Sequence, residues 1–101
     1  MARLAGCLGL CRRAGKAFIG ADLCAEAIKK GKTRLVILAS DVAPNTEKKI
    51  AAVAAHHSVR VAKGDLTREE LAHAVGKTGP VGAVAVSEEF FELVTTSLKA
   101  E

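Results

Sequence analysis

The residues most capable of chemistry in this chain are lysines and arginines gathered in its first third. Residues 1–34 hold eight Lys or Arg against two Asp or Glu, a charge of +6, while residues 35–101 hold seven against nine, a charge of −2. A localised basic patch in a chain with three aromatic residues favours a phosphate backbone as partner. An ordinary solvated face explains the same charge equally well, so charge alone does not decide between the two.

The cysteines and histidines do not form a recognisable metal or catalytic site. Cys7 and Cys11 share one face of an expected helix, but no His or Cys near them completes a tetrahedral set. We therefore expect them and Cys24 to be small buried residues of a reduced, cytoplasmic protein. The histidines are interpreted as solvated helix residues; they are His56, His57 and His73.

Two further patterns could bind phosphate or a substrate. Gly15 and Gly20 give G-x-x-x-x-G, but Ala21 follows where a phosphate-binding loop needs Lys. Asp41 ends an expected strand, where open α/β sheets bind ligands, yet a turn or helix-capping role is the stronger interpretation. A small-molecule enzyme built on Ser40–Asp41 is the weakest alternative, because no second acid or nucleophile accompanies it. The sequence predicts no enzyme, no cofactor and no metal.

Alternating helices and strands must position these residues. Apolar residues at helical spacing predict the helices, and uninterrupted apolar runs predict strands covered on both faces. In chain order we expect a helix over 2–14, an extended piece Ala17–Ile19, a helix Ala21–Lys30 ended by Gly31, a strand Arg34–Ser40, a helix from Pro44, a strand Val59–Ala62, a helix capped by Thr67 and Glu70, a strand Val81–Val86 and a last helix capped by Ser87.

This order predicts one domain over residues 1–101, an α/β fold with a mostly parallel sheet in a three-layer α/β/α sandwich. The longest apolar run, Leu35–Ala39, is far short of the roughly 20 residues that span a bilayer. No cleavage-site pattern follows the first helix, so we expect that helix in the mature protein and no membrane partner.

Several stretches together resemble the kink-turn RNA-binding ribosomal proteins, in particular the small bacterial YlxQ-like branch. They are "RRAGK" followed by Gly20, "AIKKGK" leading into "LVILASD", the "PN" after it, and "ELAHAVGKTGPVGAVAV". The resemblance covers roughly residues 3 to 98. It implies a four-stranded mixed sheet in which Ala17–Ile19 supplies the extra strand, and a non-catalytic protein of a ribonucleoprotein.

The resemblance also implies where RNA would bind. In that family the turn before the second helix, and the first residues of that helix, contact the sheared G·A pairs of a kink-turn, helped by the loop before the last strand. Nearby lysines, with Arg12 and Arg13, would contact phosphates. The implied RNA-binding residues are Lys16, Gly20, Ala21, Asp22, Leu23, Glu26, Lys29, Lys30, Lys32, Lys77, Thr78 and Gly79.

At three of these positions the chain departs from the family pattern of Gly-x-Asn-Glu with a Lys three residues later. Gly20 matches, but Asp22, Leu23 and Glu26 stand at the Asn, Glu and Lys positions. An ionised Asp accepts hydrogen bonds but donates none, and Leu does neither. Capping the helix is an equal alternative for Asp22, and a core position is an equal alternative for Leu23. The second contact loop, often apolar in the family, is Lys77–Pro80 here.

The sequence therefore predicts a non-catalytic, cytoplasmic, bacterial RNA-binding protein that is a monomer when free. Its expected partner is structured RNA, such as a kink-turn or ribosomal RNA, because the scarcity of aromatic residues argues against a platform for stacking single strands. The alternative is a ribosome-associated protein-interaction module with weak or non-specific affinity for RNA.

Overall fold

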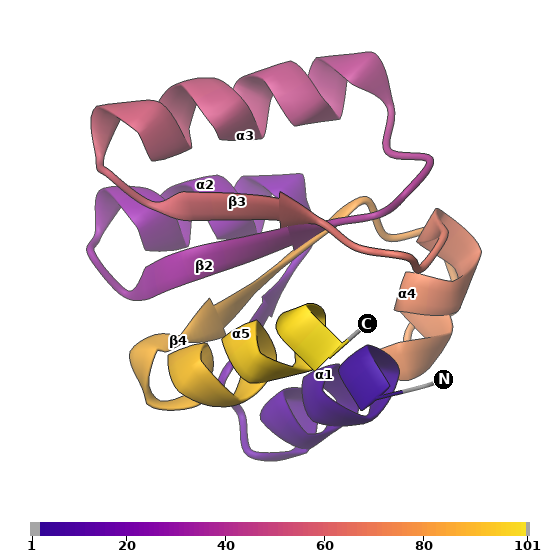
Figure 1. Cartoon of the computed structure of the whole chain (residues 1–101). Coiled ribbons are helices and arrows are strands. Elements are labelled where there is room, and N and C mark those ends of the chain that lie inside the picture. The colour runs from indigo at the N-terminus through magenta and orange to yellow at the C-terminus, as the bar shows by residue number, and fades with distance from the viewer. Residues whose placement is uncertain (1–2, 101) are drawn as a thin grey trace.

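The computed structural model describes residues 3–100 and has a sheet between two layers of helices (Figure 1). Its elements in chain order are α1 (Arg3–Arg13), β1 (Ala17–Ile19), α2 (Ala21–Lys29), β2 (Thr33–Leu38), α3 (Pro44–His56), β3 (Arg60–Lys63), α4 (Arg68–Ala74), β4 (Ala83–Ser87), the 3₁₀ turn η1 (Glu88–Phe90) and α5 (Phe91–Ala100). The expected α/β/α sandwich is confirmed. Within residues 3–100, no helix combines the length and the hydropathy that crossing a membrane requires.

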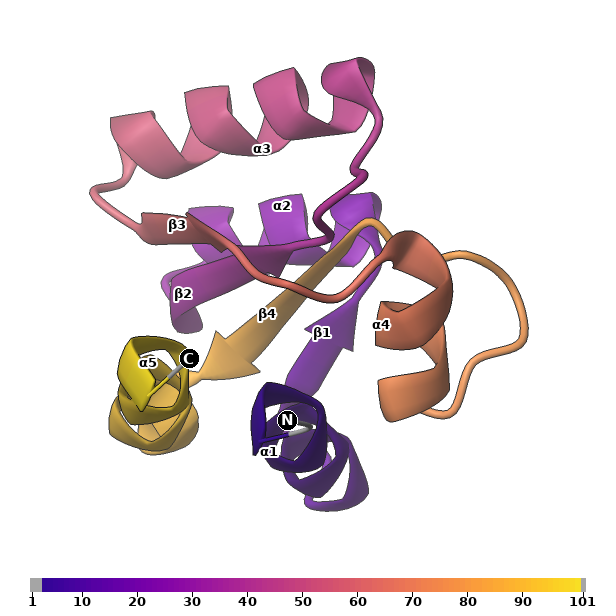
Figure 2. The same ribbon diagram turned by 45° about the vertical axis from the view of Figure 1, so that its right-hand side comes forward.

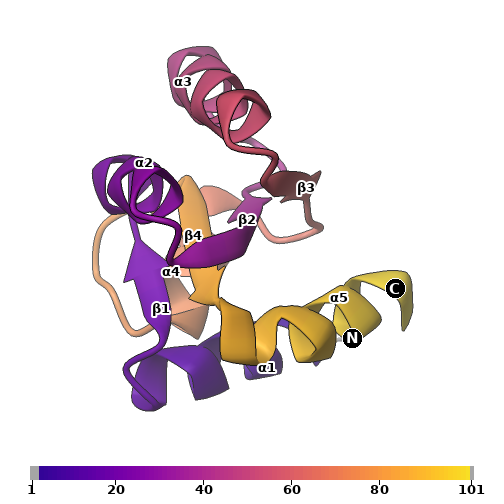
Figure 3. The ribbon, with the colours of Figure 1, turned by 90° about the vertical axis from the view of Figure 1, so that its left-hand side faces the viewer.

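Helices cover both faces of the sheet. α2 and α3 pack against each other on one face, and α1 packs against α4 and α5 on the other. Figures 2 and 3 show the two layers from different sides, with the sheet between them. The loop between α4 and β4 extends outward from the rest of the domain (Figure 2).

The sheet is mixed, with the strand order β1-β4-β2-β3. β2 and β3 are parallel, whereas β4 runs antiparallel to both of its neighbours, β1 and β2. The mixed four-stranded sheet is thus confirmed, but the expectation that it would be mostly parallel is wrong. The apolar runs in β2 and β4 are explained by helices that cover both faces of these strands. A strand covered on both faces can be parallel or antiparallel to its neighbours, so the apolar run did not determine its direction.

The predicted apolar stripes form one core. Leu4 and Leu8 of α1, Ile28 of α2 and Ile50 of α3 are all 1 % exposed or less. They pack against the central strands β2 and β4, whose residues Leu35–Leu38 and Ala83–Val86 are buried. Burial of each large side chain in this way stabilises the fold by about 1.5–3 kcal/mol.

The predicted helix boundaries are mostly right. Thr67 and Glu70 form the expected capping box, with the Thr67 N–H donating to Glu70 Oε1 at 2.9 Å and the Glu70 N–H donating to Thr67 Oγ1 at 3.2 Å. Ser87 is different, since its side chain caps nothing and its Oγ donates to Glu89 Oε1 at 3.3 Å. The turn η1 separates Ser87 from α5, so the expected Ser87 cap is wrong.

Candidate nucleic-acid interface

Gly20 forms the turn between β1 and the start of α2. Its φ of 101° and ψ of 154° lie in a region that is essentially restricted to glycine. A Cβ at Gly20 would meet nothing within 4 Å, so the backbone is open to a close approach from outside. The Gly20 carbonyl accepts from the Cys24 N–H at 3.0 Å, which begins the helix.

The first turn of α2 is open to solvent. No side chain caps this helix end, so the backbone N–H groups of its first turn keep the partial positive charge that attracts phosphate. Asp22 and Leu23 are exposed, and Ala21 is half-buried. The N-cap is Gly20, so the alternative in which Asp22 caps the helix is wrong.

The start of β4, into which the exposed loop at residues 77–80 leads, lies beside this turn. The Gly20 N–H donates to the carbonyl of Ala83 at 2.9 Å, and Ile19 is paired with Val84 in the sheet. Residues 77–80 of the loop are all exposed. α4 anchors both ends of the loop, because the Lys77 N–H donates to Ala72 O at 2.9 Å and the Val81 N–H donates to Arg68 O at 3.1 Å.

We use the term Gly20 surface for residues 20–23 together with residues 77–80. This definition includes seven of the predicted site residues, which are Gly20, Ala21, Asp22, Leu23, Lys77, Thr78 and Gly79. Arg12 adds charge at its border, since a Cβ at Gly76 would lie 3.4 Å from Arg12 Cζ.

The carboxylate of Asp22 is paired across two helices. Lys49 Nζ of α3 donates to Asp22 Oδ1 at 2.5 Å. This hydrogen bond and the positive charge of Lys49 hold the pKa of the Asp22 carboxyl below its ordinary value. Lys49 therefore supplies a positive charge beside the position where the family pattern has an uncharged Asn. Nothing in the sequence around Lys49 signalled this contact, because it depends on how α2 and α3 pack.

Leu23 is a surface residue. Its side chain is 51 % exposed, so the alternative that placed it in the core is wrong. It points an apolar side chain outward from the first turn of a helix whose inner face is made by Cys24, Ala27 and Ile28. An exposed leucine beside an open backbone is available for contact with a partner.

The remaining predicted residues do not join the Gly20 surface. Lys29, Lys30 and Lys32 follow the other end of α2, which is about 13 Å long. Lys16 precedes β1, whereas Gly20 follows it, and Lys16 Nζ pairs with Glu89 Oε1 at 3.0 Å. Glu26 faces Lys30, with 3.4 Å between Oε2 and Nζ. The basic residues that stood out in the sequence are thus distributed over two ends of the domain.

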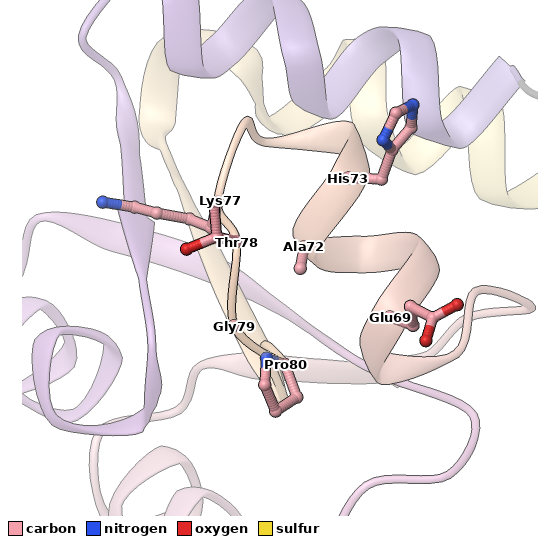
Figure 4. A pocket seen from close by; sticks show the side chains of 7 residues that line it. All are labelled: Glu69, Ala72, His73, Lys77, Thr78, Gly79 and Pro80. Carbon is pink, nitrogen blue, oxygen red and sulfur yellow. The ribbon is translucent and has the colours of Figure 1, made fainter.

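A groove of about 330 Å³ lies between α4 and the exposed loop (Figure 4). Glu69 and His73 of α4 line it together with the loop residues 77–80. Lys77 extends away from α4, on the opposite side from His73 (Figure 4). Because of this groove, the side of the loop that faces α4 is accessible, as is the side from which Lys77 extends.

The residues considered for catalysis have structural roles. Asp41 Oδ1 accepts from the Arg68 N–H at 2.7 Å, so this carboxylate caps the first turn of α4. A capping role was expected, but for the neighbouring helix α3. Burial raises the pKa of Cys24 to about 12 and that of Cys11 to about 11, so both thiols are protonated at neutral pH. Among the described residues no three His, Cys, Asp or Glu side chains group as metal ligands.

Comparison of the sequence with known proteins identifies relatives of this chain. The model of the ribosomal protein L7Ae/L30e/S12e/Gadd45 family matches residues 2–93. The RNA-binding protein YlxQ of Bacillus subtilis (strain 168) is 34 % identical over 84 residues, which is 83 % of this chain and 82 % of that protein.

Two solved structures share the fold. A protein with unknown function from Bacillus halodurans C superposes with a TM-score of 0.87 and 27 % identity, over 98 % of this chain and 99 % of that one. The 15.5kD RNA binding protein of Giardia lamblia superposes with a TM-score of 0.76 and 16 % identity, over 97 % of this chain and 83 % of that one. At that identity the likeness shows the fold alone.

Proposed function

This chain belongs to the ribosomal protein L7Ae/L30e/S12e/Gadd45 family, and we propose that it is a non-catalytic RNA-binding protein that contacts structured RNA through the Gly20 surface. The similarity to an RNA-binding protein of Bacillus subtilis supports the class of partner. The proposal includes a cytoplasmic location and a monomeric free state.

The observation that carries the proposal is the hydrogen bond between Gly20 and Ala83. It ties the uncapped start of α2 to the first residue of β4, the strand into which the exposed loop leads, and this supports a site with two contact segments. At Gly20 the RNA backbone can approach without meeting a side chain. The N–H groups that begin α2 can donate to a phosphate there, and Lys77 and Arg12 add positive charge at the border.

We propose a kink-turn, in ribosomal or other structured RNA, as the preferred target, recognised chiefly by its shape and its backbone. Asp22 can accept from a base amino or imino group while Lys49 offsets its charge near phosphates. Leu23 cannot hydrogen-bond a base edge, so it contributes apolar contact only. We therefore expect the preference over a plain duplex to be smaller than a full set of base contacts would give, since each good base contact contributes about 1–3 kcal/mol.

Titration of the protein with a kink-turn RNA and with a plain duplex of equal length, over a series of salt concentrations, tests this function. We expect tighter binding to the kink-turn, weakened by Lys77→Ala and unaffected by Lys48→Ala, a control at another exposed lysine. Equal and weak binding to both RNAs would exclude kink-turn recognition. If neither RNA binds at low salt, a ribosome-associated protein-interaction module becomes the better description.

A further inference from the structure

A second group of basic residues lies at the end of the domain opposite the Gly20 surface. α2 and α3 end there, and the parallel strands β2 and β3 begin there, as the left side of Figure 1 shows. Arg60 opens β3 and is the partner of Leu35, so it lies beside Arg34 at the same end of the sheet. We use the term distal basic surface for four exposed residues, which are Lys29, Lys32, Arg34 and Arg60.

The charges of this surface are available to a partner. Among the side chains that the structure describes, none of its four residues forms an ion pair. Five cations elsewhere in the domain, including Lys16 and Lys30, lie within 4.0 Å of an acid. Lys63 pairs with Glu47 at 3.2 Å and Arg68 lies 3.6 Å from Asp41, in addition to the contact between Lys49 and Asp22.

Arg34 is held in place by an aromatic ring. Its Cζ lies 4.2 Å from the centroid of the Phe91 ring, which covers one face of the guanidinium. The N–H groups of a guanidinium lie in its plane, so stacking on a ring leaves them free to donate to a phosphate. Because the ring already restricts this side chain, less conformational entropy is lost when it binds.

Two grooves extend the surface along α2 and α3. Lys29 lines a groove of about 260 Å³ with His56 and His57, the residues that end α3. It also lines a groove of about 410 Å³ together with Lys30 and Lys49 and with the acids that pair with them, Glu26 and Asp22. Two further acids lie to one side of the surface, since Glu88 and Glu89 follow Ser87, the partner of Thr33, and Glu89 is paired with Lys16.

We propose that the distal basic surface binds the phosphate backbone of a second RNA segment, of double-helical form. This inference rests on the proposed function for the class of partner and adds a second site to it. Cations that are spaced over one helix end and two strand starts match a row of phosphates better than one compact anion. None of the three phenylalanine rings is free for stacking bases, because Phe91 is covered by Arg34 and Phe18 and Phe90 pack against the core, so a duplex suits the surface better than a single strand.

The double variant Lys32→Gln with Arg60→Gln tests the proposal. We expect its affinity for a plain RNA duplex to fall about tenfold, and the slope of log affinity against log salt to fall by about two. The control Lys48→Gln with Lys63→Gln changes the net charge equally at other positions, and it should leave duplex binding within about twofold of the parent. An equal loss in both double variants would overturn the proposal, because it would show dependence on net charge alone.

A second arm separates the two sites. The protein is captured on an immobilised kink-turn RNA, and a labelled plain duplex is then added. We expect the captured protein to bind the duplex, and the Lys32→Gln, Arg60→Gln variant to be captured normally but to bind little duplex. If the protein is not captured, the proposed kink-turn recognition is wrong. The duplex titration with the two double variants still tests whether the distal basic surface binds RNA. If Lys77→Ala, and not the distal variant, abolishes duplex binding, the second site is refuted.

Discussion

The backbone N–H of Gly20 donates to the carbonyl of Ala83 at 2.9 Å, and this one bond joins the turn before α2 to the first residue of β4. The exposed loop at residues 77–80 leads into that strand, so the two segments of the Gly20 surface are tied to one strand start. The shape of this surface depends on backbone atoms, so substitutions that alter the backbone should affect it more than substitutions of its side chains.

Replacing Gly20 with alanine should lower the free energy of unfolding by about 1–3 kcal/mol, because only glycine tolerates its φ of 101° and ψ of 154°. Gly6→Ala is a matched control with the opposite expected sign. Gly6 is exposed within α1 with open space around it, so alanine should stabilise the protein by about 0.5–1 kcal/mol. Urea unfolding of the two variants measures both effects, and a loss of the same size in both would contradict the role given to Gly20.

Asp22→Asn should strengthen binding to a kink-turn RNA several-fold. The amide can donate as well as accept, and the substitution removes a negative charge close to phosphates. Asp65→Asn makes the same chemical change at an exposed loop residue and should alter affinity much less. Titrations of the two variants in parallel decide the point. An unchanged or lower affinity for Asp22→Asn would show that Asp22 does not face the RNA.

Removing Lys49 should raise the pKa of the Asp22 carboxyl, because the hydrogen bond and the charge that lower it are lost in Lys49→Ala. A lowered carboxyl pKa stabilises the fold above the unfolded pKa, and that stabilisation disappears as the pH falls through the folded pKa. The pair is exposed, so we expect no measurable change in the free energy of unfolding between the parent and the variant. Carbon-13 NMR of the carboxyl group over an acid titration measures the pKa, and an unshifted Asp22 would argue that the pair does not persist in solution.

Leu23→Ala should weaken binding to the kink-turn RNA several-fold while changing stability by less than about 0.5 kcal/mol, as is usual for an exposed site. Leu93→Ala is the control, because Leu93 is a leucine of α5 that is 42 % exposed and lies outside the Gly20 surface. Thermal unfolding and RNA titration of both variants test this. If both variants bind like the parent, Leu23 does not contact the RNA.

Alkaline pH should destabilise the fold through its buried thiols. The folded pKa values of Cys11 and Cys24 are raised to about 11 and about 12 by burial, so an unfolded chain loses these protons first. Stability is constant below the unfolded pKa of the thiols, near their ordinary value of 9.0, and falls as the pH rises above it towards 11. Unfolding of the parent and of Cys24→Ala at about pH 8 and about pH 10, on either side of that value, should give a smaller decline in the variant.

Residue spacing predicted the helices α1 to α5 and the strands β2, β3 and β4, because spacing reports burial, whereas the family resemblance implied the strand Ala17–Ile19. Leu4, Leu8 and Cys11 recur at helical intervals, and all three are buried. Residue spacing could not predict the direction of β4, because an apolar run is the same in a parallel and an antiparallel strand when helices cover both faces. Direction depends on the path of the chain between strands.

The candidate site was predicted only in part. Gly20 and the loop at residues 77–80 were predicted to contact RNA together, and the bond from Gly20 to Ala83 places the turn beside the strand into which that loop leads. Lys29 and Lys32 are close to Gly20 in the sequence, but a helix of nine residues lies between them and carries these lysines to the other end of the domain. The contact of Lys49 with Asp22 needed the packing of two helices, which no local pattern contains.

The outer strand β3 has a consequence for solubility. It is four residues long, begins with Arg60, ends with Lys63 and has a neighbour on one side only, β2. An unpaired edge with N–H and C=O groups invites a strand from another molecule, but a short edge that begins with the charge of Arg60 disfavours pairing with a second copy of itself. Arg60, which we assign to RNA binding, thus also opposes edge-to-edge aggregation at β3, and bound RNA would cover the same edge.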